Sequence, residues 1–197
     1  MKAATQVFCL GDFVLNKKGG DIYRVDSVEI VESFYPLCED FEKLALANYL
    51  MELCVDAYSD SDANIMSLLL NSLYVLAYKD LDMELVKPVF ELKLAQFSGY
   101  APYVDGCMVC NDTSVTRFDF SGGTVCDLCR GGDTVEIFPG TLSAMRYILS
   151  SDEKKLFSFE VTDIIKSQLS YICEKYLAEK TEKNYKSLEY YKKIKRK

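Results

Sequence analysis

Four cysteines form two Cys-x-x-Cys pairs, and this spacing is typical of a metal site. The pairs are Cys107 with Cys110 and Cys126 with Cys129, and fifteen residues separate them. Two thiolates at this spacing can hold one ion from a tight turn, and a second such turn completes a tetrahedron of sulfurs. Because four sulfurs leave no open position for water or substrate, the motif predicts a structural Zn²⁺ rather than a catalytic one.

The segment between the two pairs has the pattern of a short hairpin. Residues 115–120 and 124–125 are suited to strands, and Gly122-Gly123 can adopt the positive φ of a tight reversal. The same cysteines could instead form two disulfides or remain unrelated thiols. The spacing argues against both alternatives, and so does the lack of a secretory segment.

Several kinds of catalytic chemistry lack the residues that they need. The chain contains no histidine, which removes Ser-His, Cys-His and His-metal catalysis. Its glycine pairs are not followed by the Lys-Ser/Thr of a phosphate-binding loop. The thirty acidic residues leave carboxylate catalysis open, but no pair among them is singled out. We therefore predict that the protein is not an enzyme and has no catalytic residue.

Charge is distributed unevenly along the chain. The net charge is −7, but residues 183–197 carry +6, which leaves −13 on residues 1–182. An acidic body repels nucleic acid, whereas a basic tail can attract phosphate. The alternative is that these lysines form a solvated, frayed end. The apolar runs are too short to span a membrane and no signal peptide is recognisable, so we expect a cytoplasmic protein without membrane contacts.

The remaining patterns predict a mainly α-helical protein with a small β part. Residues 7–15 and 21–32 are typical of a hairpin, whose alternation places Val28 and Ile30 on one face and Tyr23 and Val25 on the other. Helical periods follow at 40–58, 65–77, 79–97, 141–149, 160–179 and 187–194. Within these helices, Pro88 is expected to kink its helix or to mark its first turn, and Thr141 is expected to cap the next. The isolated Cys9, Cys38, Cys54 and Cys173 are predicted to be core residues.

Five sequence motifs occur in a specific order along the chain. They are EIVESFYPLCED (29–40), VFELKLAQFSGYAP (89–102), CMVC (107–110), FDFSGGTVCDLC (118–129) and YKSLEYY (185–191). In this order they resemble the bacterial RecO family of DNA repair and recombination mediators, and the resemblance covers essentially residues 5–194.

The resemblance implies an N-terminal OB-fold, a helical domain and a zinc finger. Residues 1–36 would be a partial OB-fold that has only its last strands, because the first part of the barrel has no counterpart here. Residues 37–197 would be the helical domain, with the four-cysteine zinc finger inserted at 103–138. The four cysteines named above carry over as the ligands of the finger.

The resemblance also implies a function and partners. Proteins of this kind bind single- and double-stranded DNA, anneal complementary strands, engage the C-terminal tail of single-strand-binding protein and help RecR to load RecA. The residues that we expect to contact DNA are the basic ones of the hairpin, the finger and the tail: Lys17, Lys18, Arg24, Arg117, Arg130, Lys192, Lys193, Lys195 and Arg196. The alternative is a zinc-containing protein-interaction module that does not bind DNA directly, which the acidic body favours.

Overall fold

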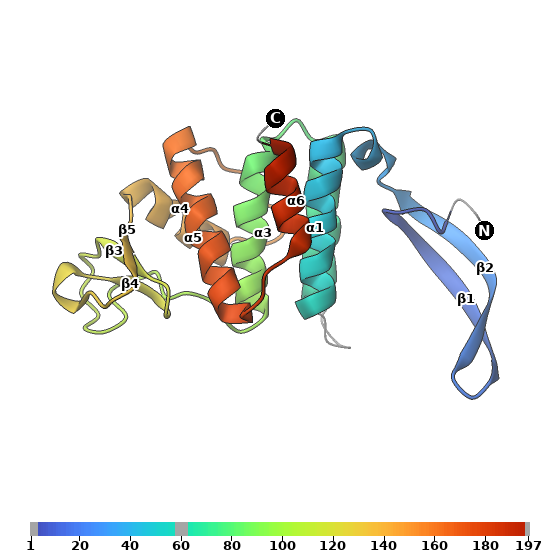
Figure 1. Cartoon of the computed structure of the whole chain (residues 1–197), viewed down its shortest axis with the longest axis horizontal. Coiled ribbons are helices and arrows are strands. Elements are labelled where there is room, and N and C mark those ends of the chain that lie inside the picture. The colour runs from blue at the N-terminus through green and yellow to red at the C-terminus, as the bar shows by residue number, and fades with distance from the viewer. Residues whose placement is uncertain (1–3, 58–62, 196–197) are drawn as a thin grey trace.

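The computed structural model describes residues 4–57 and 63–195. Figure 1 shows a central group of helices with a long hairpin at one end and a small sheet at the other. The helices are α1 (Phe41–Ala57), α2 (Ala63–Tyr78), α3 (Met83–Phe97), α4 (Pro139–Ser150), α5 (Asp163–Thr181) and α6 (Lys186–Lys195). The strands are β1 (Cys9–Gly19), β2 (Ile22–Ser33), β3 (Arg117–Asp119), β4 (Gly123–Val125) and β5 (Thr134–Glu136), and 3-10 turns lie at Tyr35–Cys38 and Asp127–Cys129. The prediction of a mainly α-helical chain with small antiparallel sheets is therefore confirmed.

Helix α3 lies at the centre of the helical group and contacts α1, α2, α4 and α5. Asp82 caps it, because its side chain accepts a hydrogen bond from the backbone N–H of Glu84 at 2.9 Å. Every residue from Leu85 to Ala95 is buried, as a helix packed on all sides requires. Pro88 lies in the second turn and the helix continues through it, so this proline does not mark the first turn.

A network of charged side chains is buried where α3 meets α1 and α5. Lys87 Nζ lies 2.9 Å from a carboxylate oxygen of Glu91 and 2.9 Å from one of Glu174. The hydroxyl of Tyr49 donates to Glu91 at 2.7 Å. Burial opposes the charge on Lys87, but Glu91 and Glu174 outweigh it and hold the pKa of Lys87 above its ordinary value. Burial also raises the pKa of Glu91, against the pull of Lys87.

Two local predictions fail for reasons that the packing explains. Helix α4 begins at Pro139, two residues before the expected cap, because proline is well suited to a first helical position. Thr141 is instead fully buried within the first turn. Cys54 and Cys173 are buried as expected, but Cys38 is exposed, because it ends a short 3-10 turn at the surface.

The hairpin has β-bulges that change which side chains share a face. Its antiparallel register passes over Asp26 and Val31 in β2, and each extra residue shifts the alternation of the strand by one position. Cross-strand partners share a face, so one face combines Phe13, Leu15 and Lys17 with Tyr23, Val25, Val28 and Ile30. The opposite face combines Leu10, Asp12, Val14 and Asn16 with Arg24, Ser27, Glu29 and Glu32. The prediction from strict alternation, which separated Tyr23 and Val25 from Val28 and Ile30, is therefore wrong.

Within residues 4–57 and 63–195, the hairpin contacts the helices at its base. Phe8 and Phe34 are buried in the main core, and the hydroxyl of Tyr78 on α2 donates to the carbonyl of Ser33 at 2.8 Å.

Among the described residues, no helix has both the length and the apolar character needed to cross a membrane.

Candidate metal centre

We call residues 103–138 the four-cysteine segment. This segment is built on a three-stranded antiparallel sheet in the order β4-β3-β5. Tyr103 adds a short parallel bridge to Gly123 at the edge of this sheet. The predicted hairpin is thus present as β3 and β4, and β5 extends it on the other side of β3. The sheet brings the end of β4, and with it the second cysteine pair, back beside the first.

The first cysteine pair lies in a turn that backbone hydrogen bonds close. The N–H of Cys107 donates to the carbonyl of Asp112 at 2.7 Å, and the N–H of Asn111 donates to the carbonyl of Cys107 at 2.8 Å. Asn111 adopts a φ of 62°, a left-handed conformation that asparagine tolerates better than most residues. The N–H of Met108 donates to the carbonyl of Thr124 at 2.9 Å, which ties this turn to β4.

The second cysteine pair lies in the 3-10 turn that follows β4. The N–H of Cys129 donates to the carbonyl of Cys126 at 3.1 Å, and this bond closes the turn. The hydroxyl of Thr116 donates to the carboxylate of Asp127 at 2.8 Å and so holds the turn against the start of β3. Both turns therefore present their cysteines from backbone that is already hydrogen-bonded.

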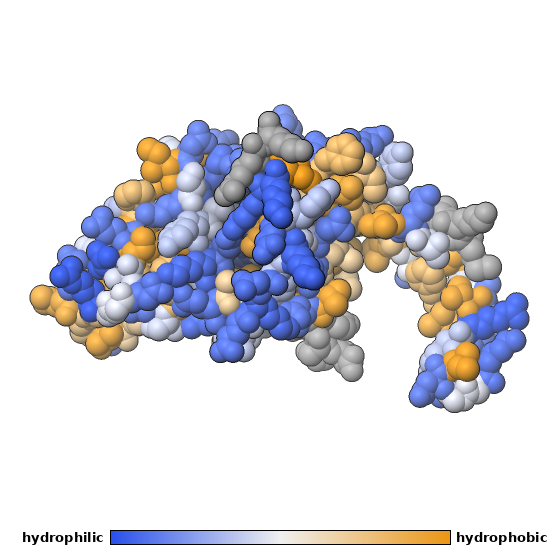
Figure 2. All heavy atoms as spheres, viewed as in Figure 1, coloured by the Kyte–Doolittle hydropathy of each residue, from blue (hydrophilic) through white to orange (hydrophobic). Residues whose placement is uncertain are grey.

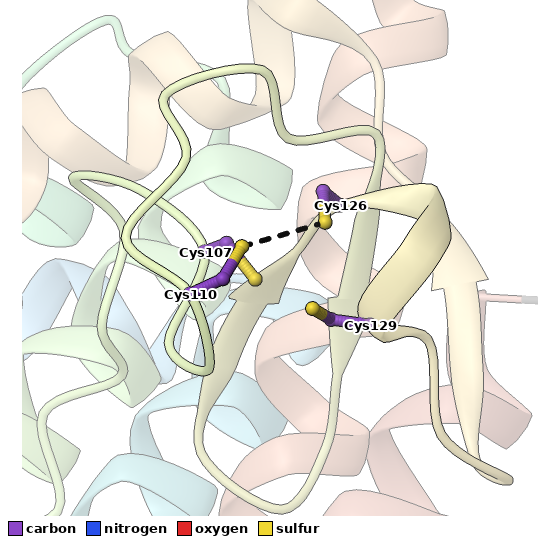
Figure 3. A group of neighbouring side chains, drawn as sticks. All are labelled: Cys107, Cys110, Cys126 and Cys129. Atoms are coloured by element: carbon purple, nitrogen blue, oxygen red, sulfur yellow. Dashed lines mark hydrogen bonds between the residues drawn. The ribbon is translucent and has the colours of Figure 1, made fainter.

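The four thiols converge on one point. Their sulfur atoms all lie within 4.8 Å of one another, and Figure 3 shows the side chains of Cys107, Cys110, Cys126 and Cys129 directed inward. The sulfurs of Cys110 and Cys126 are 3.7 Å apart, too far for a disulfide. A tetrahedral ion with bonds of about 2.3 Å to sulfur holds its ligands about 3.8 Å apart. The residues therefore fit a single ion with four thiolate ligands.

The surroundings of the thiols shift the pKa values of Cys107 and Cys129 in opposite directions. Burial acts to raise the pKa of Cys107, but backbone N–H groups, first that of Cys110 and then that of Cys126, bring it down to about 6. Hydrogen bonds with Cys110 and Cys126 raise the pKa of Cys129 to about 12. Hence Cys107 already favours the thiolate form that a metal requires, whereas Cys129 favours the protonated form and would lose its proton to an ion.

Gly123 is required by the close approach of another backbone segment. Its φ is 151°, and a Cβ atom there would lie 2.2 Å from the carbonyl oxygen of Tyr103. We expect Gly123→Ala to destabilise the four-cysteine segment by more than about 1 kcal/mol, because both the backbone angle and the contact forbid a side chain. Thermal unfolding of the metal-loaded protein measures the effect. Gly132→Ala is the matched control, since nothing lies within 4 Å of its Cβ position, and an equal loss in both variants would contradict the prediction.

The sequence analysis missed a residue that supports the first turn. The hydroxyl of Thr124 lies 2.7 Å from the carbonyl oxygen of Gly106 and 3.2 Å from that of Tyr103. Thr124 therefore fixes the chain immediately before Cys107. Its position just ahead of the second cysteine pair could have signalled a supporting role, but no sequence pattern names the partner carbonyls.

Aromatic contacts fix the four-cysteine segment onto α5. The ring of Phe118 packs edge-on against Tyr176 with centroids 5.6 Å apart, and Phe120 packs against Tyr171 at 6.2 Å. Lys175 Nζ lies 3.9 Å from the ring centroid of Phe120. These rings come from β3 and the residue after it, so this strand holds the four-cysteine segment against α5.

The basic residues expected to contact DNA lie in separate parts of the molecule. Lys17, Lys18 and Arg24 are exposed near the tip of the β1–β2 hairpin, at the opposite end of Figure 1 from the four-cysteine segment. In that segment Arg130 is exposed, whereas Arg117 is half-buried and donates to the hydroxyl of Thr134 at 2.9 Å. Arg117 thus joins β3 to β5.

The basic residues of α6 are partly neutralised by acidic residues of other helices. Lys192 forms an ion pair with Glu174 on α5, and Lys195 Nζ lies 2.8 Å from a carboxylate oxygen of Glu84 on α3. Lys193 is exposed, and Arg196 lies outside the described residues. The structure therefore brings the four cysteines together, but it does not gather those of the basic residues that it describes into one surface.

The fold and the site define a class of protein, in which a helical domain carries a small sheet with four clustered cysteines. Comparison with known sequences gives the family. Residues 38–189 match the family model described as "Recombination protein O C terminal". The protein named DNA repair protein RecO of Acetivibrio thermocellus is 35% identical over 201 residues, which cover 98% of this chain and 80% of that protein. Those of Alkaliphilus metalliredigens and Clostridium novyi are 32% and 28% identical, over 98% of this chain and 81% and 77% of theirs.

The chain belongs to the RecO family. The resemblance found in the five sequence motifs is therefore confirmed. The family consists of recombination proteins that are not known as enzymes, in agreement with the prediction made from the missing catalytic residues.

Proposed function

We propose that this protein is a DNA repair and recombination mediator of the RecO type. It would bind single- and double-stranded DNA, promote annealing, and help to load RecA together with RecR and single-strand-binding protein. The observation that carries this proposal is the family match over 38–189, with relatives named DNA repair proteins that align along nearly the whole chain. The hairpin would be the remaining part of an OB-fold.

The four-cysteine segment would be a zinc finger that holds a structural Zn²⁺. Cys107, Cys110, Cys126 and Cys129 would be its ligands, and the ion would stabilise a region whose strands have only three residues each. The sulfur spacing and the all-thiolate set support zinc over harder cations such as magnesium. With every position filled by sulfur, the ion would shape the finger rather than perform chemistry.

Single-stranded DNA would contact the tip of the hairpin. There Lys17, Lys18 and Arg24 are exposed. In the described residues, the only ion pair that any of the three forms is the one between Arg24 and Asp26, at the long distance of 4.0 Å. Tyr23 and Phe13 are exposed on the same hairpin, and aromatic rings offer stacking platforms for bases. Lysines that already pair with carboxylates, such as Lys192, would add less.

We expect the affinity for a single-stranded oligonucleotide to fall as salt rises, with a log–log slope of about −2 from three phosphate contacts. Lys17→Ala/Lys18→Ala should flatten this slope by about 1.4. Fluorescence anisotropy with a labelled oligonucleotide at several salt concentrations measures both values. Lys192→Ala is the control that should leave the slope unchanged, because Glu174 already neutralises it. A slope near zero in the unmodified protein would remove phosphate contacts from the proposal.

A protein-interaction module without direct DNA binding is the second candidate function. The net charge of −13 on residues 1–182 and the pairing of α6 lysines with acidic residues support it. An annealing assay with complementary labelled strands separates the two functions. Annealing above the spontaneous rate supports the mediator, whereas retention of a protein partner without annealing supports the module.

A further inference from the structure

The four clustered cysteines differ in their access to solvent. Cys107 and Cys126 are buried, with exposed fractions of 0% and 5%, and Cys129 is half-buried, whereas Cys110 is exposed. Cys110 also lies in a run of exposed residues, 109–114. Figure 2 shows the four-cysteine segment at one end of the molecule, opposite to the hairpin. A reagent that arrives from solvent therefore meets the sulfur of Cys110 before the other three.

The sulfur of Cys126 lies beside that of Cys110, although the two cysteines belong to different turns. The two sulfur atoms are 3.7 Å apart (Figure 3). The N–H of Met108 donates to the carbonyl of Thr124 at 2.9 Å, two residues before Cys126. The hydroxyl of Thr124 donates to the carbonyl of Gly106 at 2.7 Å. Because these bonds involve no sulfur, they bring Cys126 toward the first turn independently of an ion.

We propose that Cys110 and Cys126 are a redox pair, which a hydroperoxide converts to a disulfide with release of the ion from the four-cysteine segment. The release step rests on the zinc finger of the proposed function. Disulfide formation requires the two sulfur atoms to approach each other by about 1.7 Å, which rotation of the side chains supplies once the ion no longer holds them.

The reaction transfers two electrons from sulfur to the peroxide. With hydrogen peroxide, the sulfur of Cys110 attacks one oxygen, the O–O bond breaks, and the hydroxide that leaves takes up a proton to become water. Cys110 is then a sulfenic acid. The thiolate of Cys126 attacks the sulfenic sulfur, the S–S bond forms, the S–O bond breaks, and a second hydroxide leaves and takes up a proton. Zinc has no redox chemistry of its own and leaves as Zn²⁺.

The disulfide leaves two thiolates, Cys107 and Cys129, for the ion. Because a structural zinc site needs four ligands, a site with two of its sulfurs oxidised gives up its ion to a chelator. The disulfide keeps the two turns joined, as the ion did before. Reduction restores all four thiolates, so the segment alternates between a form held by the ion and a form held by the disulfide.

Release of zinc is the first measurement that tests the pair. Hydrogen peroxide is added to the zinc-loaded full chain while a chromophoric chelator records the free ion. We expect one ion to be released for each disulfide formed, and dithiothreitol with added zinc to reverse both changes. Cys38→Ser is the matched control and should release zinc at the same rate, because Cys38 is exposed but lies outside the cluster.

Peptide mapping without reduction identifies which cysteines are joined. Cys110→Ser would lose a ligand and with it the ion, so the four cysteines are compared within one chain. After free thiols are alkylated, trypsin cleaves at Lys93, Arg117 and Arg130, which places the first cysteine pair in one peptide and the second pair in the next. A disulfide between the turns joins the two peptides, whereas a disulfide within a turn leaves them separate. We expect joined peptides, linked through Cys110 and Cys126 on fragmentation, to increase in step with the released zinc.

The outcomes separate this pair from the zinc finger itself. Zinc release with separate peptides, or with a link through Cys107 or Cys129, overturns the pair. Zinc that is retained while Cys38 becomes oxidised also overturns it and leaves the finger intact. A chain that holds no zinc before peroxide is added overturns the finger as well.

Discussion

Replacing Cys107 with serine should abolish metal binding and unfold the four-cysteine segment while the helices persist. Cys107 is completely buried and its backbone is hydrogen-bonded to Asp112, so no other side chain can take its place. We expect the metal affinity to fall by more than about 100-fold, since the loss of a group that merely supports a ligand already costs that much. Metal analysis of the purified variant gives the first measurement.

Limited proteolysis distinguishes local unfolding from global unfolding in this variant. New cleavage sites are expected within residues 103–138, because the strands of that region have three residues each and would lose the order that the proposed ion gives them. Circular dichroism should retain the helical signal. Cys38→Ser is the matched control, since Cys38 is exposed and lies outside the cluster. Unchanged resistance to protease in the Cys107→Ser protein would contradict a structural ion.

The clustering of the four cysteines was predictable because its determinants are local in sequence. The Cys-x-x-Cys spacing fixes which atoms can share one ion, and glycine at the reversal fixes how the second pair returns to the first. The three-stranded form of the sheet was not predictable in the same way. Strand β5 follows the second pair, and its pairing with β3 depends on contacts such as Arg117 with Thr134 that no local pattern encodes.

The faces of the hairpin were mispredicted for a related reason. Alternation assigns faces correctly only while two strands stay in register, and an extra residue in one strand reverses the assignment beyond it. Asp26 and Val31 are such residues. Gly11 lies at the shift opposite Val31, but neither glycine nor proline lies at the shift beside Asp26. The helices were easier, since their apolar period identifies a buried face without any knowledge of its partner.

The role of the C-terminal lysines also depends on partners that are distant in the sequence. Lys192 and Glu174 are eighteen residues apart, and Lys195 and Glu84 are separated by most of the helical region. From the sequence alone, a basic tail is predicted to be a cationic surface that is free to attract phosphate. In the folded protein part of that charge holds α6 onto α3 and α5.

Replacing Lys87 with methionine should destabilise the protein by about 3–5 kcal/mol, because it leaves Glu91 buried without a counter-charge. Glu91 is fully buried, and its remaining partner is the hydroxyl of Tyr49. Urea unfolding followed by circular dichroism measures the change. Lys154→Met, at an exposed lysine, is the control and should alter stability by less than about 0.5 kcal/mol. Lys87→Met/Glu91→Gln should recover most of the loss, because the amide keeps an acceptor for Tyr49 and carries no charge.

The loss in the Lys87→Met protein should depend on pH in a direction that the burial of Glu91 fixes. Burial raises the pKa of Glu91 in the folded protein, and removal of Lys87 takes away the main influence that lowers it. The folded variant therefore holds a proton that the unfolded chain releases near its ordinary pKa of about 4.3. Stability is then greatest below that value and falls as pH rises toward the raised folded pKa. Free energies of unfolding measured at about pH 6 and about pH 8 in excess zinc should show that the Lys87→Met protein loses more stability, relative to the unmodified protein, at the higher pH. An equal penalty at both, or a larger one at the lower pH, would mean that Glu91 is not the charge left unpaired.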